Sequence, residues 1–328
     1  MSKAWMRVLT VTLTSTLTKR SYTFGANEGT NLDITVTGYK YMSTLKDSCV
    51  IEIKNLSYFQ VIDIIDSKFY DVEVKCGYKD SGRITMFKGA VLYISNNIEP
   101  NRTHTIVILC GSNLIAKYKQ SRLNLSLNSS INTYTAIKQI AAFAGLDLSK
   151  INVSNSMNKP LSNDRTTVNT TFAQFIENLC ESNENYVVST DSTLGDDIKI
   201  FDISKTNSRV INMKNEWILL TSGYPRLTSE GLTLTVLPTL NFICGDIIDI
   251  DNALINIYAS SSNEGDKNYS YYLDKEGQYL LYEVKYQLEN RGDNFSVELY
   301  CKSLSLVKGL YGGTQWVIQL LLTLQEFY

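Results

Sequence analysis

Apolar and polar residues alternate along most of the first 118 residues. In residues 9–17, leucine and valine share one face of an extended chain while threonine occupies the other, and residues 49–54 alternate in the same way. Further alternating runs follow at residues 72–76 and 105–110. The pattern predicts short antiparallel strands with one solvent-facing side each. The alternation alone fits an antiparallel barrel or a sandwich, and the module that we expect over residues 1–118 is a first tube-like β-barrel.

The apolar spacing changes between residues 119 and 224. Apolar residues recur every three or four positions from Ile137 to Ala144, after Thr133 as a candidate cap and before Gly145 as a candidate helix stop. The same spacing recurs from Phe172 to Cys180, which predicts a second amphipathic helix. Strand-like segments follow at residues 186–189 and 198–202. We therefore expect a small α+β middle module over residues 119–224.

Two-residue alternation returns in residues 225–308. Apolar residues at 280–288 and at 295–301 lie on either side of a turn at residues 290–293. This pattern predicts a second tube-like antiparallel β-barrel module. The expected fold class is therefore mainly β (α+β), with two barrel modules flanking the middle module.

Residues 309–328 form an apolar C-terminal tail. Two glycines, Gly312 and Gly313, precede an apolar run from Trp316 to Tyr328, and no basic residue follows Lys308. The absence of basic residues disfavours an anionic membrane surface, and the glycines separate the run from the preceding module. We expect the tail to dock on another subunit rather than on its own core. The candidate docking residues are Trp316, Val317, Leu320, Leu321 and Leu324.

Composition narrows the possible functions. The 328 residues are 20% charged, with Lys+Arg 31 against Asp+Glu 33, which lacks the basic excess of a DNA-reading protein. No apolar run is long enough to cross a membrane, and the N-terminus lacks a signal-peptide pattern. The closest two of the six cysteines, Cys49 and Cys76, are 27 positions apart, so we expect core thiols in a chain made in the cytoplasm.

Few residues offer catalytic or metal-binding chemistry. His104 is the only histidine, which excludes mechanisms that need two imidazoles, and we expect a structural role for it. Asp249 and Asp251 share one face of a predicted strand, and Asp196 and Asp197 lie in a predicted turn. Alternation on a half-buried strand and the turn preference of aspartate account for both pairs. We assign no catalytic residue, cofactor or metal ligand, and expect no enzyme activity.

The order of several short motifs resembles that of phage baseplate hub proteins, the late control protein D and VgrG-like group of contractile tails. The first barrel of that group is similar to IEIKNLS at 51–57, VEVKCGY at 72–78, MFKGAV at 86–91 and THTIVILCGS at 103–112. Its following helix resembles NTYTAIKQIAAFAGL at 132–146. Its closing barrel resembles SGYPRL at 222–227, VLPTL at 236–240, CGDII at 244–248 and GQYLLYEV at 277–284. Residues 1–20 and the tail after Lys308 lie outside the resemblance.

The resemblance implies a structural role in a virion tail baseplate. In that group three chains form a ring of six similar barrels, which joins a hexameric tail tube to a trimeric central spike. The implied partners are two further copies of the chain, the tube protein, the spike protein and other baseplate proteins, with no membrane anchor. DNA would pass through the channel without specific binding, and Asp249 and Asp251 are candidate lumen-facing residues.

Two other functions remain open at the level of sequence. A receptor-binding tail protein that recognises host glycans would expose aromatic side chains, and Tyr269, Tyr271 and Tyr272 are candidates. A peptidoglycan-cleaving tail enzyme would use paired acids such as Asp249 or Asp196. Purified protein would bind cells in the first case and degrade cell wall in the second.

Overall fold

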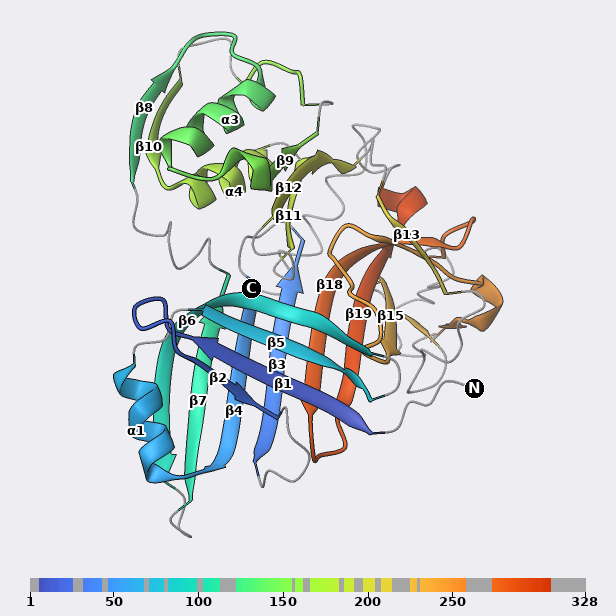
Figure 1. Cartoon of the computed structure of the whole chain (residues 1–328). Coiled ribbons are helices and arrows are strands. Elements are labelled where there is room, and N and C mark those ends of the chain that lie inside the picture. The colour runs from blue at the N-terminus through green and yellow to red at the C-terminus, as the bar shows by residue number, and fades with distance from the viewer. Residues whose placement is uncertain are drawn as a thin grey trace, which may run out of the picture.

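The computed structural model contains a large β-sheet and a smaller module that carries two helices (Figure 1). It describes residues 6–25, 32–42, 47–67, 71–79, 82–98, 103–112, 122–154, 157–161, 166–182, 186–191, 197–203, 208–213, 225–228, 231–257 and 273–307. The tail residues Trp316, Val317, Leu320, Leu321 and Leu324, the tyrosines Tyr269, Tyr271 and Tyr272, and Asp196 lie outside the described residues.

The N-terminal segment consists mainly of strands, as its alternating sequence predicts. Its elements are β1 (Arg7–Thr14), β2 (Ser21–Phe24), β3 (Asp33–Tyr41), β4 (Ser48–Leu56), α1 (Tyr58–Asp66), β5 (Asp71–Tyr78), β6 (Gly82–Ile98) and β7 (His104–Gly111). Leu9, Val11 and Leu13 of β1 are buried, as predicted, but the prediction was wrong for Leu17, which lies in the turn after β1 and is 68% exposed. Helix α1 was not predicted. Ser57 and Gln60 form a capping box at its start, which is a sequence signal for a helix N-terminus.

The middle segment contains the two predicted helices. Its elements are β8 (Leu123–Leu127), α3 (Thr133–Phe143), η1 (Leu148–Lys150), β9 (Ile151–Val153), β10 (Thr166–Thr170), α4 (Phe172–Ser182), β11 (Tyr186–Asp191) and β12 (Asp197–Asp202). Asn132, rather than Thr133, caps α3, because its side chain accepts a hydrogen bond from the backbone N–H of Thr135 at 2.7 Å. Gly145 follows the helix with a φ of 72°, as its predicted stop role requires.

The C-terminal segment returns to strands. Its elements are β14 (Arg226–Thr228), β15 (Gly231–Val236), β16 (Ile247–Asp249), η4 (Asn252–Leu254), β17 (Asn256–Ile257), β18 (Gln278–Glu289) and β19 (Phe295–Ser303). Strand β13 (Val210–Asn212) lies before residue 224, within the range predicted for the middle module, but pairs with β16. The predicted apolar face of β19 is buried. In β18 a bulge between Leu281 and Glu283 shifts the register, so Leu280 and Leu281 are both buried and Tyr282 is half-buried.

A single sheet joins the two β segments. Along its main path the strand order is β17-β14-β15-β19-β18-β3-β4-β7-β6-β5-β1-β2, and β13 and β16 complete a sheet of 14 strands. The two segments meet where β3 pairs antiparallel with β18, and one hydrophobic core extends through both. Most pairs are antiparallel, but β13 with β16 and β14 with β17 are parallel. The predicted mainly β fold is confirmed, and the module boundaries at residues 118, 224 and 308 stay predictions.

Side-chain contacts also connect the start of β1 with the turn between β18 and β19. The guanidinium of Arg7 donates to the Gly292 carbonyl at 2.7 Å and lies 5.3 Å from the ring centroid of Phe295. The rings of Tyr78 and Phe295 meet edge to face at a centroid distance of 5.6 Å. Strands β1 and β5 of the N-terminal segment therefore contact the C-terminal hairpin, although several strands separate them along the sheet.

Candidate functional site: the junction of the middle module and the large sheet

Strands β11 and β12 connect the middle module to the large sheet through two opposite faces. Val188 and Ile200 belong to the hydrophobic core of the middle module, together with the buried faces of α3 and α4. Val187 and Ile203 belong instead to the core of the large sheet. Because successive side chains of a strand point to opposite faces, one hairpin contributes to both cores. The middle module is therefore packed against the sheet.

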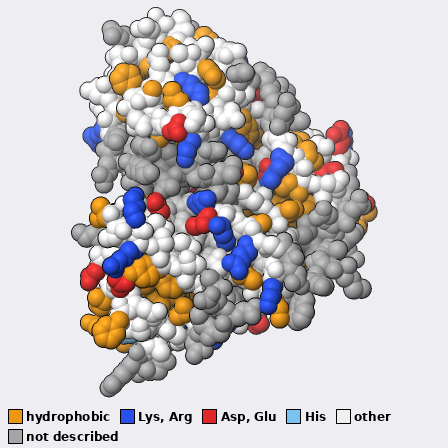
Figure 2. Space-filling view, in the orientation of Figure 1, with side chains coloured by type: hydrophobic (Ala, Val, Ile, Leu, Met, Phe, Trp, Pro, Cys, Tyr) orange, Lys and Arg blue, Asp and Glu red, His pale blue; other side chains and the backbone are white. Residues whose placement is uncertain are grey.

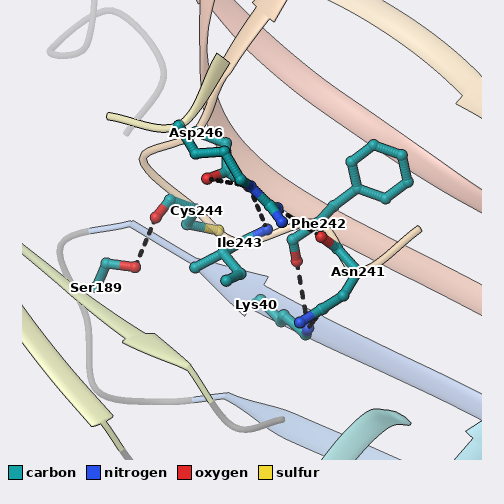
Figure 3. Close-up of polar contacts among 8 residues, drawn as sticks. Lys40, Ser189, Asn241, Phe242, Ile243, Cys244 and Asp246 are labelled. Atoms are coloured by element: carbon teal, nitrogen blue, oxygen red, sulfur yellow. Dashed lines mark hydrogen bonds and ion pairs between the residues drawn. The ribbon is translucent and has the colours of Figure 1, made fainter. Parts of the chain in front are cut away.

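The loop from Asn241 to Asp246 lies between this hairpin and the sheet (Figure 3). The Ser189 hydroxyl of β11 donates to the Cys244 carbonyl at 2.6 Å, and this bond is buried. On the other side, the Gly245 N–H donates to the Leu281 carbonyl and the Leu281 N–H donates to the Asp246 carbonyl, both at 2.8 Å. The loop is thus hydrogen-bonded to both the middle module and β18.

An ion pair closes the end of the loop. The Arg209 guanidinium, which is half exposed, contacts the buried Asp246 carboxylate at 2.5 Å and donates to the Asn241 carbonyl at 2.6 Å. The same carboxylate accepts a hydrogen bond from the Ile243 N–H at 3.0 Å. Arg209 therefore bridges the two ends of the loop, at Asn241 and Asp246, and attaches the loop to the segment that leads into β13.

The N-terminal segment also contacts the junction, through Lys40. Its side chain is only 1% exposed on the core face of β3, and its ammonium donates to the Phe242 carbonyl at 3.3 Å and to the Asn241 side-chain oxygen at 3.4 Å. A buried ammonium is costly unless acceptors and negative charges surround it. Lys40 of β3, Ser189 of β11 and the backbone of β18 are therefore all hydrogen-bonded to one loop.

Burial raises the pKa of the thiols of the chain. All six cysteines are free and buried, as predicted. Burial raises the pKa of Cys49 to about 12 and that of Cys180 to about 12, and it raises the pKa of Cys244 well above its usual value despite the nearby Lys40 charge. A protonated thiol is neither a nucleophile nor a metal ligand. Within the described residues, no group of three or more His, Cys, Asp or Glu side chains could hold a metal ion.

The structure separates the two predicted carboxylates of residues 249–251. Asp249 ends β16 and is half-buried, whereas Asp251 is exposed and caps η4 by accepting from the Ala253 N–H at 2.9 Å. The strand therefore ends before Asp251. Their predicted position at a channel lumen stays a prediction.

The other residues that the sequence singled out have structural surroundings. His104 begins β7, where its Nδ1 lies 3.3 Å from the Asn96 side-chain oxygen. Asp197 begins β12 and pairs in register with Asp191. No described helix is long and apolar enough to cross a membrane.

Sequence reasoning missed the polar residues of the junction. Lys40 stands in register with Ile34 and Val36 on the apolar face of β3, so a charge at a core position was a visible signal. Asp246 follows a glycine with a φ of 96° in a short turn, and nothing in the sequence distinguished it from other turn aspartates.

Comparison with known proteins finds similarity in structure but not in sequence. No protein-family model matches the sequence, and no curated protein matches it either. Among solved structures, the 43 kDa tail protein of prophage MuSo2 from Shewanella oneidensis matches with a TM-score of 0.54 at 10% identity. The match covers 92% of this chain and 98% of that chain.

Two further structures extend the likeness to secretion systems. The E. coli c3393 protein, a type VI secretion component that itself resembles the T4 bacteriophage tail proteins gp27 and gp5, matches with a TM-score of 0.54. That match covers 84% of this chain and 75% of that chain at 10% identity. The Francisella PdpA-VgrG complex contains a chain matched with a TM-score of 0.53 and 10% identity, over 93% of this chain and 54% of that one.

The fold is therefore that of phage tail proteins and of VgrG-related secretion proteins. This likeness confirms, at the level of fold, the resemblance indicated by the order of the sequence motifs.

Proposed function

We propose that the chain is the structural hub of a phage tail baseplate. Three copies would form a ring of pseudo-sixfold symmetry that joins the hexameric tail tube to the trimeric central spike. The observation that carries this proposal is the match to the prophage tail protein, which extends over nearly the whole length of both chains. A match of that extent includes both β segments and the middle module, rather than one common domain.

The polar junction suits a part that transmits force. Ser189 and the Asn241–Asp246 loop connect the middle module to β18, and Lys40 adds β3. A ring between tube and spike must keep its shape when the tail acts, and contacts from three segments to one loop resist relative movement of those segments.

The charge balance supports a passage for DNA. A net charge of −2 over the whole chain avoids the phosphate binding that clustered lysine and arginine would produce. In this proposal Asp249 and Asp251 face the channel, where carboxylates repel phosphate. A trimer structure with both residues on the outer wall would contradict that placement.

The proposed partners are two further copies of the chain, the tail tube protein, the central spike protein and other baseplate proteins. The tail residues Trp316, Val317, Leu320, Leu321 and Leu324 are proposed to dock on an adjacent subunit or the spike, because an apolar segment gains free energy when a partner covers it. No catalytic step belongs to this role, and the virion tail is its proposed location.

Cryo-electron microscopy of whole tails tests the proposal, with this subunit located in the map. We expect a threefold ring of six barrel-like units at the junction of tube and spike. A peripheral position would contradict the hub role. Purified protein that binds host cells alone would support the receptor-binding alternative, and purified protein that degrades peptidoglycan would support the enzyme alternative.

A further inference from the structure

Helix α1 exposes apolar side chains beyond the face that it buries. Val61 and Ile64 are buried in the large core, while the opposite face is open to solvent and Phe59 is 82% exposed. The other exposed apolar side chains of the helix are Tyr58, Ile62 and Ile65, which follow helical spacing. Four exposed apolar side chains on a helix of nine residues are an unusually large apolar surface to leave open to solvent. The outer face of α1 therefore has the composition of an interface.

The exposed apolar surface continues from α1 onto the end of β6. The ring of Tyr58 lies 5.8 Å from that of His104, and His104 pairs in register with Ile98, which is 66% exposed. We call this surface, consisting of Tyr58, Phe59, Ile62, Ile65 and Ile98, the α1 patch. Its charged neighbours on the helix are Asp63, which pairs with Arg20 at 3.7 Å, and the exposed Asp66. The charge of Asp63 is therefore compensated within the chain, and Asp66 is the exposed carboxylate that α1 contributes beside the patch.

A second apolar surface lies on the opposite side of the molecule. Val210 is 52% exposed in β13, and Leu240 is exposed next to Asn241, whose carbonyl accepts a hydrogen bond from Arg209. We call Arg209, Val210 and Leu240 the β13 patch. The Arg209 guanidinium is half exposed while its partner Asp246 is buried, so the positive group of the pair faces solvent.

The figures show how the two patches are placed. Helix α1 and strand β13 lie on opposite sides of the body in Figure 1. Figure 2 shows hydrophobic side chains gathered over α1 at the lower left and around β13 on the right. The exposed Asp66 carboxylate beside one patch and the half-exposed Arg209 guanidinium of the other have opposite charges, so the two apolar patches are complementary between two copies of the chain.

From these observations we infer that the α1 patch of one copy docks on the β13 patch of a second copy. The inference rests on the proposed ring, because a threefold ring is closed by head-to-tail contacts that join two different surfaces of each chain. Apolar burial would supply the affinity, and Asp66 beside Arg209 would set the direction of docking.

Intermolecular disulfide formation in assembled tails tests the contact directly. Tails are prepared with Ile62→Cys, with Val210→Cys, and with both substitutions in one chain, and then mildly oxidised. The double variant should give covalent species of up to three chains. The native cysteines are all buried, so wild-type tails serve as the blank. Linked dimers from Ile62→Cys alone would indicate a symmetric α1–α1 contact and would overturn the inference, as would the absence of any linked chain.

Two exposed phenylalanines test how much the α1 patch contributes to the affinity between the copies. Phe59→Asp should raise the dissociation constant of the assembled ring at least tenfold in light-scattering dilution series of the full chain, because a carboxylate would be buried in the contact. Phe143→Asp is the control, since Phe143 is 72% exposed at the end of α3 and belongs to neither patch. Equal effects of the two variants would contradict the inference. A ring seen in tails without the disulfide link would leave the hub role standing and remove only this contact.

Discussion

At the scale of single residues, Asp274 shows how one buried carboxylate organises a turn. One of its oxygens accepts from the N–H groups of Glu276 at 3.0 Å and Gln278 at 3.1 Å, and the other accepts from the Ser303 hydroxyl at 2.9 Å and the Ser305 N–H at 2.7 Å. Burial opposes ionisation, but the hydrogen bonds, led by those from Ser305 and Gln278, outweigh it and hold the pKa of Asp274 below its ordinary value of 3.8.

This lowered pKa predicts a pH-dependent effect of Asp274→Asn. The carboxylate stabilises the folded state fully above the unfolded-state pKa, and that stability is lost as pH falls through the lower folded-state pKa. We expect the variant to lose about 2–4 kcal/mol at pH 7 in urea denaturation, because its amide cannot accept all four bonds. The difference from wild type should shrink below about pH 4. The exposed neighbour variant Glu276→Gln is the control and should change stability little at either pH.

A second residue-scale prediction concerns Gly38, which pairs in register with Tyr286 where the two β segments join. A Cβ atom at Gly38 would lie 2.0 Å from the ring of the fully buried Tyr286. Gly38→Ala should therefore lower the free energy of unfolding by about 2–4 kcal/mol, measured by urea denaturation. Thr37→Ala, on the opposite face of the strand, should cost less than about 1 kcal/mol. Tyr286→Leu removes the ring, so Gly38→Ala should then lower the free energy of unfolding by less than it does in the wild-type background. Equal losses in the two backgrounds would contradict the steric explanation.

At the scale of elements, α1 is the helix that the sequence analysis did not predict. Its apolar residues do follow helical spacing at positions 58, 61, 62 and 65, but the helix has only nine residues and lies between alternating strands, so the run is too short to stand out. The capping box was the available signal, since the Ser57 N–H donates to the Gln60 side-chain oxygen at 2.9 Å and the Gln60 N–H donates to the Ser57 hydroxyl at 3.3 Å. By contrast, α3 and α4 each bury one stripe and were correctly predicted.

The capping box makes a prediction about α1. Ser57→Ala removes the acceptor for the Gln60 N–H and should destabilise the protein by about 1 kcal/mol in chemical denaturation. Ser67→Ala at the other end of the helix is the control, because the Ser67 backbone rather than its side chain makes the C-terminal bond to Asp63. A loss of the same size in the control would show that the cap contributes nothing specific.

At the scale of the whole molecule, the pairing of β3 with β18 merges two segments that are far apart in the sequence. Seven register pairs connect the strands, from Glu283 with Tyr41 to Glu289 with Thr35. The buried residues of both segments form one core, whereas α3 and α4 pack around a separate core. The two β segments should therefore unfold together.

Native-state hydrogen exchange checks this cooperativity. Amides in β3, β4, β18 and β19 should exchange with one common free energy, equal to that of global unfolding. Amides of α3 serve as the internal comparison, because the middle module has its own core and can open separately. A difference of more than about 2 kcal/mol between β3 and β18 would contradict a shared cooperative unit.

The local elements could be predicted from the sequence, because alternation and helical spacing are properties of neighbouring residues. The sequence predicted β19, α4 and the stop at Gly145, and the order of its motifs indicated the tail-protein fold. Three features could be seen only in the folded chain: the pairing of β3 with β18, the bulge beside Leu281, and the convergence of Lys40, Ser189 and Asp246 on one loop. These features depend on contacts between residues far apart in the chain, and no local pattern specifies which distant strand will lie beside another.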